Sequence, residues 1–408
     1  MSLMYGRYHY GRYIFAGRAH VSGSTPVLKP TFLPGQVQII AYAKDGTKTD
    51  IYGTGVKNVA FSQLQFELVE TGSGTCTITF KTLPAVSRLT YGQRIDVHLY
   101  GDYRPWYSGY VLNIPVEGGT QEEFKVTCHG YYNRLKNKLV FDTYENMEIS
   151  MIVRDIILKA ESTTEVQYNP AKVQNVGYTV SYIKFDGVSV QEALKQLSEF
   201  AYDYVYGVDE YQDVYFKARS AAINEEARLW VGKHIHSFEP SVNVDKLVNW
   251  ARIKGAANDE ETGEVWLTTV EDVDSQNKYG RYEKTWTLPS AYKAADVEQW
   301  GKSELARYKD PIESAKVKDL KLEYPKKNEY WVRKLSTEGK ALVVDKDGST
   351  HTYPITKIKY TVNADSGIKA EMELGEPPFR LDKYLFDIER NARNTELLEQ
   401  ASRDKGVI

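Results

Sequence analysis

Apolar and polar residues alternate with a period of two over most of the chain, which is the pattern of β-strands with one buried face. The clearest run is YGQRIDVHLYGDYRPWYSGYV at residues 91–111. Its core face is predicted to carry Ile95, Val97 and Leu99. Its solvent face is predicted to carry the alternating residues Arg94, Asp96, His98 and Tyr100. Gly101 and Asp102 are expected to turn the chain into a return strand. A lone hairpin is unstable, so we expect a larger sheet or barrel.

The same alternation fills residues 36–140 and returns after residue 229. Turn signals separate the short strands, and two of them contain Asp-Gly, at Lys44–Thr47 and at Lys346–Ser349. Asp-Gly between alternating segments is a hairpin signal. Many short strands with such turns predict a barrel or a sandwich.

The period changes to a helical one in four places. Residues 147–160 and 189–201 carry helical apolar stripes, with Asn146 as the expected N-cap of the first and a capping box formed by Ser189 and Glu192 in the second. The second stripe consists of Val190, Ala193, Leu194, Leu197 and Phe200. Residues 291–308 are also predicted to be helical, as is the C-terminal segment, whose stripe contains Leu381, Leu385 and Ile388.

These patterns predict a mainly β fold with an α/β insertion. We expect two barrel-like domains, a small α/β domain and a C-terminal helix. The expected segments are an N-terminal Tyr/Arg-rich arm at 1–35, a first β-barrel-like domain at 36–144, the α/β insertion at 145–228, a second β domain at 229–376 that includes the helix 291–308, and the C-terminal helix at 377–408. A chain of 408 residues is long enough for several domains.

The N-terminal arm repeats Tyr-Gly-Arg-Tyr and places Tyr5, Arg7, Tyr10 and Arg12 close together. Interleaved arginine and tyrosine could stack on single-stranded nucleic acid. The arm could instead become ordered against a partner subunit. We favour the second interpretation, because so few charges give a weak electrostatic footprint.

Composition narrows the classes of partner. The chain has 52 basic and 55 acidic side chains, a net charge of −3, which gives no overall attraction to nucleic acid or to a membrane surface. No apolar run approaches the ~20 residues of a membrane helix, so we expect a protein made in the cytoplasm with no membrane segment. Cys76 and Cys128 occupy apolar positions of alternating strands and are predicted to be buried free thiols rather than a disulfide.

Candidate chemistry is sparse. His234 and His236 share one face of an expected strand and could ligate a metal, but no further ligand completes the site. Residues 345–349 resemble the start of a calcium loop without its final glutamate, so a hairpin tip is the favoured interpretation. Carboxylates at Glu117, Glu122 and Glu123 could serve glycoside cleavage, although clustered acids at a strand end are usually solvated. We therefore expect no enzyme, cofactor or metal.

Four stretches resemble the phage tail and baseplate hub family, which includes late-control protein D-like proteins and the valine-glycine-repeat spikes of secretion systems. They are RIDVHLYGDYRPWYSGYVLNI, SVQEALKQLSEFAYDYVYGVDEYQDVYF, KLVNWARIKG, and KIKYTVNADSGIKAEMELGEPP together with the preceding VEQWGKSELARY. The resemblance covers roughly residues 36–380. The arm, the tail helix and the absence of a fused needle or hydrolase domain depart from the family pattern.

The resemblance implies a structural virion protein of the tail tip. Such hubs are homotrimers whose two tube domains per chain adapt a sixfold tail tube to a threefold spike or fibre. DNA or the tape-measure protein passes through the lumen during genome ejection, without specific binding, and the tube or distal tail protein is a further partner. The expected interface side chains are Tyr5, Arg7, Tyr10, Arg12, Ile39, Ile95, Val97, Leu99, Trp250, Leu381, Leu385 and Ile388.

Two other functions remain open. The 31 tyrosines would suit a receptor- or carbohydrate-binding tail protein, because tyrosine is enriched at interfaces. The acidic loops would suit a polysaccharide-degrading enzyme.

Overall fold

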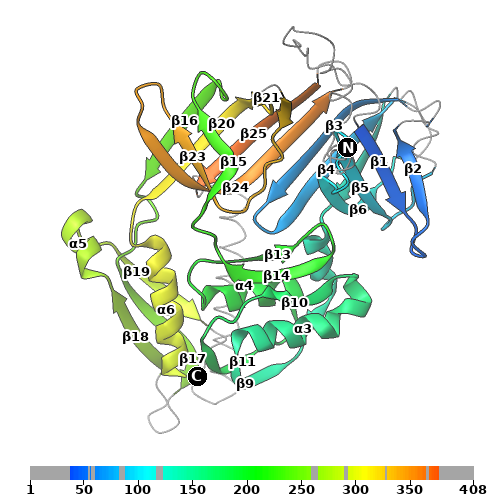
Figure 1. Cartoon of the computed structure of the whole chain (residues 1–408). Coiled ribbons are helices and arrows are strands. Elements are labelled where there is room, and N and C mark those ends of the chain that lie inside the picture. The colour runs from blue at the N-terminus through cyan, green and yellow to red at the C-terminus, as the bar shows by residue number, and fades with distance from the viewer. Residues whose placement is uncertain are drawn as a thin grey trace, which may run out of the picture.

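The computed structural model describes residues 37–53, 56, 60–81, 88–115, 123–258, 265–288, 293–326, 329–363 and 367–375. The fold is mainly β with several sheets and a smaller helical part, as the alternation predicts. Figure 1 shows a region built of strands above a region in which helices cover smaller sheets. The expected N-terminal arm and C-terminal helix lie outside the described residues.

One sheet runs through the whole β-region and contains strands from both ends of the described chain. We call it the continuous sheet; its strands, in spatial order, are β16 (Ser237–Asn243), β20 (Ile312–Leu320), β25 (Gly367–Gly375), β24 (Thr350–Asn363), β3 (Phe61–Val69), β4 (Gly72–Phe80), β7 (Phe124–His129), β6 (Tyr107–Asn113), β5 (Arg94–Leu99), β1 (Val37–Tyr42) and β2 (Lys48–Tyr52). The two β-rich parts of the sequence join where β24 pairs antiparallel with β3.

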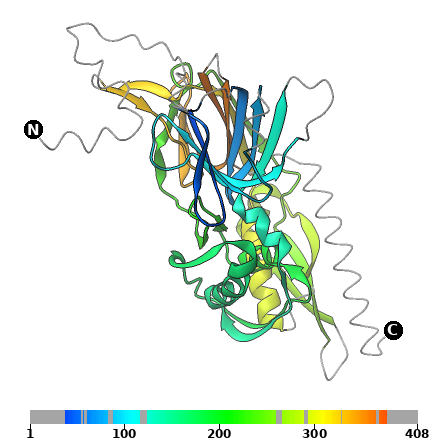
Figure 2. The ribbon, with the colours of Figure 1, turned by 90° about the vertical axis from the view of Figure 1, so that its right-hand side faces the viewer.

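Each part folds a second layer over the apolar side of the continuous sheet. In one part this layer is formed by β5, β1 and β2, which are the last strands of the continuous sheet itself. In the other part it is formed by β15 (Ile223–Trp230) and β23 (Lys340–Val344), of which β23 pairs with β24. Both halves share one cluster of buried apolar residues. The β-region therefore has two core-enclosing halves and a single wall common to both. Figure 2 shows this β-region above the helices, turned by 90° from the view of Figure 1.

The predicted hairpin forms, with Ile95 opposite Gly109 and Val97 opposite Tyr107. The expected solvent face of its first strand is wrong at two positions, because Asp96 and Tyr100 are both 2% exposed. Asp96 accepts a hydrogen bond from Ser108 at 2.7 Å and pairs with Arg94 at 2.9 Å. A buried carboxylate is tolerated here because it is paired and hydrogen-bonded.

The α/β region has its own core, and two distant parts of the chain contribute to it. Its elements are η3 (Tyr131–Asn137), β8 (Leu139–Val140), β9 (Thr143–Glu148), α3 (Ile149–Thr164), β10 (Gln167–Val173), β11 (Thr179–Lys184), β12 (Val188–Ser189), α4 (Val190–Glu199), β13 (Tyr204–Val208), β14 (Asp213–Ala218), β17 (Trp250–Asn258), β18 (Val265–Glu271), α5 (Val273–Tyr279), β19 (Glu283–Leu288) and α6 (Ala294–Tyr308). The segment 248–305, expected within the second β domain, thus packs against the α/β insertion.

Local signals explain the helices. The predicted cap Ser189 accepts a hydrogen bond from the Glu192 amide at 3.2 Å, and the predicted stripe of α4 is buried. The predicted cap Asn146 is wrong, because Glu148 accepts from the Ser150 amide at 2.7 Å while Asn146 has a φ of +46°. The acidic stretch 271–274 leads into the short helix α5, which is capped by Asp272 through the Ser275 amide at 2.9 Å.

The β-region and the α/β region contact each other without room for extra atoms. An added Cβ at Gly130 would lie 1.7 Å from the Ser73 carbonyl oxygen. Arg134 of η3 donates to the Gly92 carbonyl, pairs with Glu165 at 2.8 Å and lies over the Tyr110 ring at 4.4 Å. These contacts fix the orientation of the continuous sheet relative to the helices.

One short strand pair completes the described fold. β21 (Glu323–Lys326) pairs with β22 (Glu329–Val332). No helix in the described parts of the chain is long and apolar enough to cross a membrane.

Candidate functional site: the polar face of the continuous sheet

Seven neighbouring strands of the continuous sheet direct only hydrophilic side chains to one side over most of their length. We call this surface the polar face. It consists of Ser237, Glu239 and Ser241 on β16, Lys316 and Lys318 on β20, Lys369, Glu371 and Glu373 on β25, Lys357, Lys359 and Thr361 on β24, Gln63, Gln65 and Glu67 on β3, Thr75, Thr77 and Thr79 on β4, and Lys125, Thr127 and His129 on β7. On β20, β25, β24, β3, β4 and β7 most of the intervening residues belong to the buried core, whereas on β16 they are partly or largely exposed. The polar face is therefore the outer surface of the wall.

Opposite charges alternate across the strands at one end of the polar face. Glu239 lies opposite Lys316, which lies opposite Glu373, which lies opposite Lys357. One row away, Lys359 lies between Glu371 and Glu67. Directly opposed side chains have Cβ atoms ~4.5–5.5 Å apart, so each lysine has a carboxylate within its reach.

Three ion pairs have formed on this part of the polar face. Lys357 pairs with Glu67 at 2.7 Å, Lys318 with Glu239 at 2.9 Å, and Lys369 with Asp319 at 4.0 Å. The hydrogen bond from Lys318 holds the pKa of Glu239 below its ordinary value. The same bond raises the pKa of Lys318. Both charges therefore persist at neutral pH.

The other end of the polar face is built from neutral side chains. Gln65 lies opposite Thr77, which lies opposite Thr127, and Thr79 lies opposite Lys125. Burial and the nearby Lys136 lower the pKa of His129, so it is uncharged at neutral pH. Lys125 is thus the main charge at this end.

The joint between β3 and β24 is fixed on both of its sides, and we call it the seam. On the polar side Gln63 donates to Asn363 at 3.1 Å, and the Lys357–Glu67 pair closes the opposite end. On the core side the rings of Phe66 and Tyr360 stack at 4.9 Å, and Trp106 packs edge-on against Tyr360 at 5.4 Å.

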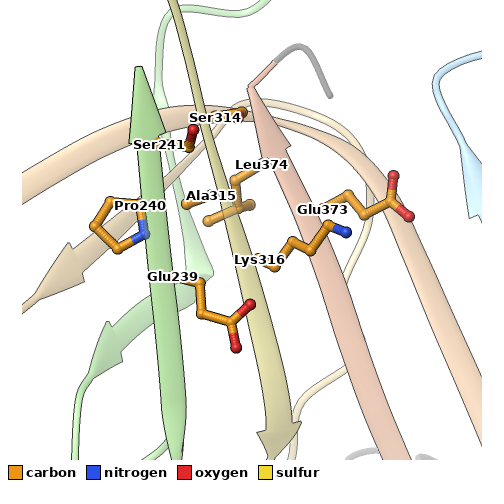
Figure 3. A pocket seen from close by; sticks show the side chains of 8 residues that line it. All are labelled: Glu239, Pro240, Ser241, Ser314, Ala315, Lys316, Glu373 and Leu374. Carbon is orange, nitrogen blue, oxygen red and sulfur yellow. The ribbon is translucent and has the colours of Figure 1, made fainter. Parts of the chain in front are cut away.

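The continuous sheet ends at β16, whose second edge has no partner strand among the described residues. Pro240 lies within β16, as is typical of an edge strand. Beside it Val242 is 67% exposed, and Val244 just beyond the strand is 48% exposed. A shallow hollow of about 210 Å³ lies over β16, β20 and β25, and Figure 3 shows Lys316 reaching toward Glu373 at its side. This open edge combines apolar contact area with unpaired backbone groups.

The predicted interface side chains fall into three groups. Ile39, Ile95, Val97 and Leu99 are fully buried within the protomer, and β1 and β5 each have two neighbouring strands. Their prediction as contact residues is therefore corrected, because they belong to the core. Trp250 is partly exposed under the Arg281 guanidinium at 4.7 Å, on a strand that also has two neighbours. The remaining candidates lie outside the described residues: Tyr5, Arg7, Tyr10, Arg12, Leu381, Leu385 and Ile388.

Among the candidate catalytic and metal-binding residues that the structure describes, none are brought together as a site. His234 is buried in a turn, where burial lowers its pKa to about 4, while His236 is exposed. Asp345 and Ser349 form a hairpin tip, in which the Ser349 amide donates to Asp347 at 2.9 Å. Glu123 is exposed, and Glu117 and Glu122 lie outside the described residues. Within the described ranges, no three His, Cys, Asp or Glu side chains gather as metal ligands do.

The two cysteines lie directly opposite each other on β4 and β7, buried on the core side of the sheet. They are free thiols, as predicted. Burial raises the pKa of the Cys76 thiol, which keeps it in its unreactive protonated form.

Solved structures of phage tail proteins share this fold. The 43 kDa tail protein of prophage MuSo2 from Shewanella oneidensis aligns with a TM-score of 0.57 at 16% identity, over 83% of this chain and 98% of that one. A tail protein from Neisseria meningitidis MC58 aligns with a TM-score of 0.57 at 10% identity, over 84% and 96%. The prophage tail protein gp18 from Listeria monocytogenes EGD-e aligns with a TM-score of 0.55 at 11% identity, over 86% and 98%.

The chain therefore has the fold of phage tail proteins, in agreement with the resemblance found in the sequence. A comparison with curated proteins gives no match. The YQBQ-like family model matches residues 52–326, which is more than half of the chain. The chain belongs to the YQBQ-like family.

Proposed function

We propose that this protein is a structural subunit of a phage tail that assembles as a homotrimeric hub. Three copies would form a ring of six wall segments, which adapts a sixfold tail tube to a threefold spike or fibre. The polar face would line the channel through which the genome and the tape-measure protein pass. We propose no catalytic activity.

The observation that carries this proposal is the continuous sheet. Its strands β16, β20, β25 and β24 come from one half of the β-region, and β3, β4, β7 and β6 come from the other. All neighbours in this series are antiparallel, so the two sets of four run in matching directions. A rotation about an axis parallel to the strands can place one set of four on the other only if their strand directions match. Two such sets in each chain would give a trimer six similar wall segments, as a pseudo-sixfold ring needs.

The open edge of β16 supports assembly. Exposed edges of long strands tend to be covered in stable proteins, and closed homo-oligomers are a common way to cover them. Val242 and Val244 would contact the neighbouring subunit there. This surface replaces the buried residues that the sequence suggested.

Mass measurement of the protein in solution tests the assembly. We expect a trimer for the wild type and a shift toward monomer for Val242→Lys, because a lysine would be desolvated at the subunit contact. Val273→Lys on α5, where the valine is 57% exposed, is the matched control and should remain trimeric. A wild-type protein that stays monomeric at high concentration, alone and with tail tube protein, would refute the hub.

A carbohydrate- or receptor-binding role is the second candidate. Tyr103 and Tyr211 are 56% and 48% exposed, and the Arg104 guanidinium lies 5.5 Å from the centre of the Tyr103 ring. Exposed aromatic rings beside a cation can bind sugars or a protein surface. Saturable binding on a glycan array, lost in Tyr103→Ala, would favour this role over a purely structural one.

A further inference from the structure

We propose that the carboxylates of the polar face mask its lysines, so that this surface lets duplex DNA pass without holding it. The proposal rests on the proposed function, in which the polar face lines the channel. It concerns the charge pattern of this chain and assigns the glutamates a role in transit rather than in folding.

The polar face carries enough lysines to bind a polyanion if they were unpaired. Five of them lie on three adjacent strands, at positions Lys316, Lys318, Lys357, Lys359 and Lys369. For a protein that neutralises Z phosphates, the logarithm of the binding constant falls with the logarithm of the salt concentration with a slope of about −0.9 Z. Five unpaired lysines on adjacent strands would therefore bind duplex DNA in a salt-dependent way.

Each of these lysines has a carboxylate beside it. Lys316 and Lys359 each lie between two glutamates of neighbouring strands. Lys318, Lys357 and Lys369 form the ion pairs with Glu239, Glu67 and Asp319. When two opposite charges lie a few ångström apart, the attraction of a phosphate to the lysine is offset by its repulsion from the neighbouring carboxylate.

Stability alone does not account for these glutamates. Lys318 and Glu239 are 49% and 52% exposed, and ion pairs that face water contribute little to folding. The neutral end of the same polar face keeps its register with glutamine and threonine pairs. The sheet therefore does not need charge to specify its pairing.

The test removes carboxylates from the polar face and measures the binding of duplex DNA. Glu239, Glu371 and Glu373 are changed to glutamine together, while Glu67 is kept because it holds the seam. Binding of a 50-base-pair duplex is followed by fluorescence anisotropy in about 50 mM salt. We expect no saturable binding by the wild type, and binding by the triple variant that weakens about 40-fold between 50 and 200 mM salt, as about three released counterions require.

A matched control separates the pattern from net charge. Glu145→Gln, Asp186→Asn and Asp274→Asn remove three exposed carboxylates of the α/β region. This control should remain unbound. Equal DNA binding by the control, or binding by the wild type as tight as by the triple variant, would overturn the proposal, as would no gain in the triple variant.

Two further measurements keep the result interpretable. The single variant Glu371→Gln alters an exposed side chain, should fold if the triple variant does not, and is expected to bind with a salt slope of about one. Mass measurement on the same samples reports the assembly separately. A monomer that gains DNA binding would refute the hub but keep the mask, whereas a trimer that gains none would refute only the mask.

Discussion

Over β3, β4 and β7 the polar face consists mainly of glutamine and threonine, whereas over β24, β25, β20 and β16 it consists mainly of lysine and glutamate. Neutral side chains both donate and accept hydrogen bonds, so they tolerate many neighbours. Charged side chains need an opposite charge across the strand, because like charges there are destabilising. Both ends of the sheet therefore present a hydrophilic surface with little net charge. At the charged end each lysine must face a carboxylate across the strands, whereas the neutral end tolerates more arrangements.

The seam holds the two ends together, and breaking it should have the largest effect. We expect Tyr360→Ala to lower the free energy of unfolding by about 3–5 kcal/mol, because it removes a fully buried ring that stacks on Phe66. Urea denaturation measures this. Tyr360→Phe keeps the ring, loses only the hydroxyl contacts with Leu335 and should cost about 1 kcal/mol. Equal stabilities for the two variants would show that the stack does not hold the seam.

The polar face has one ion pair that is mostly buried and another that is half exposed, and their coupling energies can be compared. Lys357 and Glu67 are 19% and 26% exposed. A double-mutant cycle with Lys357→Met and Glu67→Gln should give a coupling energy of about 1 kcal/mol. The same cycle on the half-exposed pair Lys318–Glu239 should give a smaller value. A larger coupling for the exposed pair would contradict the assignment of the inner pair to the seam.

The neutral contact across the seam should matter less. Gln63→Ala removes the hydrogen bond to Asn363 and is expected to cost about 0.5–1 kcal/mol. Gln65→Ala, two residues along the same strand, serves as the control and should cost less. Thermal unfolding of both variants checks the difference, and a reversed order would place the important contact elsewhere.

The smallest effect is a titration. Since the pKa of Glu239 lies below its ordinary value in the folded protein, its contribution to stability is present above that ordinary value and is lost as the pH falls through the folded pKa. Carbon NMR of the carboxyl group should show the lowered pKa. Lys318→Met should raise it again, and no change in that variant would mean that Lys318 is not the cause.

Local patterns predicted much of this fold. The alternation around Ile95 and Val97 identified the hairpin of β5 and β6, and Ser189 identified the start of α4. Such signals depend on neighbouring residues only. They failed where a side chain on the partner strand decides the outcome, as at Asp96, whose carboxylate is buried because Ser108 and Arg94 pair with it.

The polar face itself was not predicted. Alternation shows that a strand has a hydrophilic side, but it does not show which strands are neighbours. The pairing of β3 with β24 joins residues 300 positions apart, and no local pattern encodes it. For the same reason the sequence placed residues 248–305 with the second β half, although their apolar side chains pack against α4 and its surroundings.

The seam also has a consequence for the growing chain on the ribosome. β3 is synthesised early, and the strand that covers its edge follows about 300 residues later, roughly 15–60 s at ordinary rates of translation. During this interval the nascent edge beside Leu64 and Phe66 can pair with the wrong strand. A chain released before residue 350 would lack β24, so the edge of β3 that β24 covers would have no native partner.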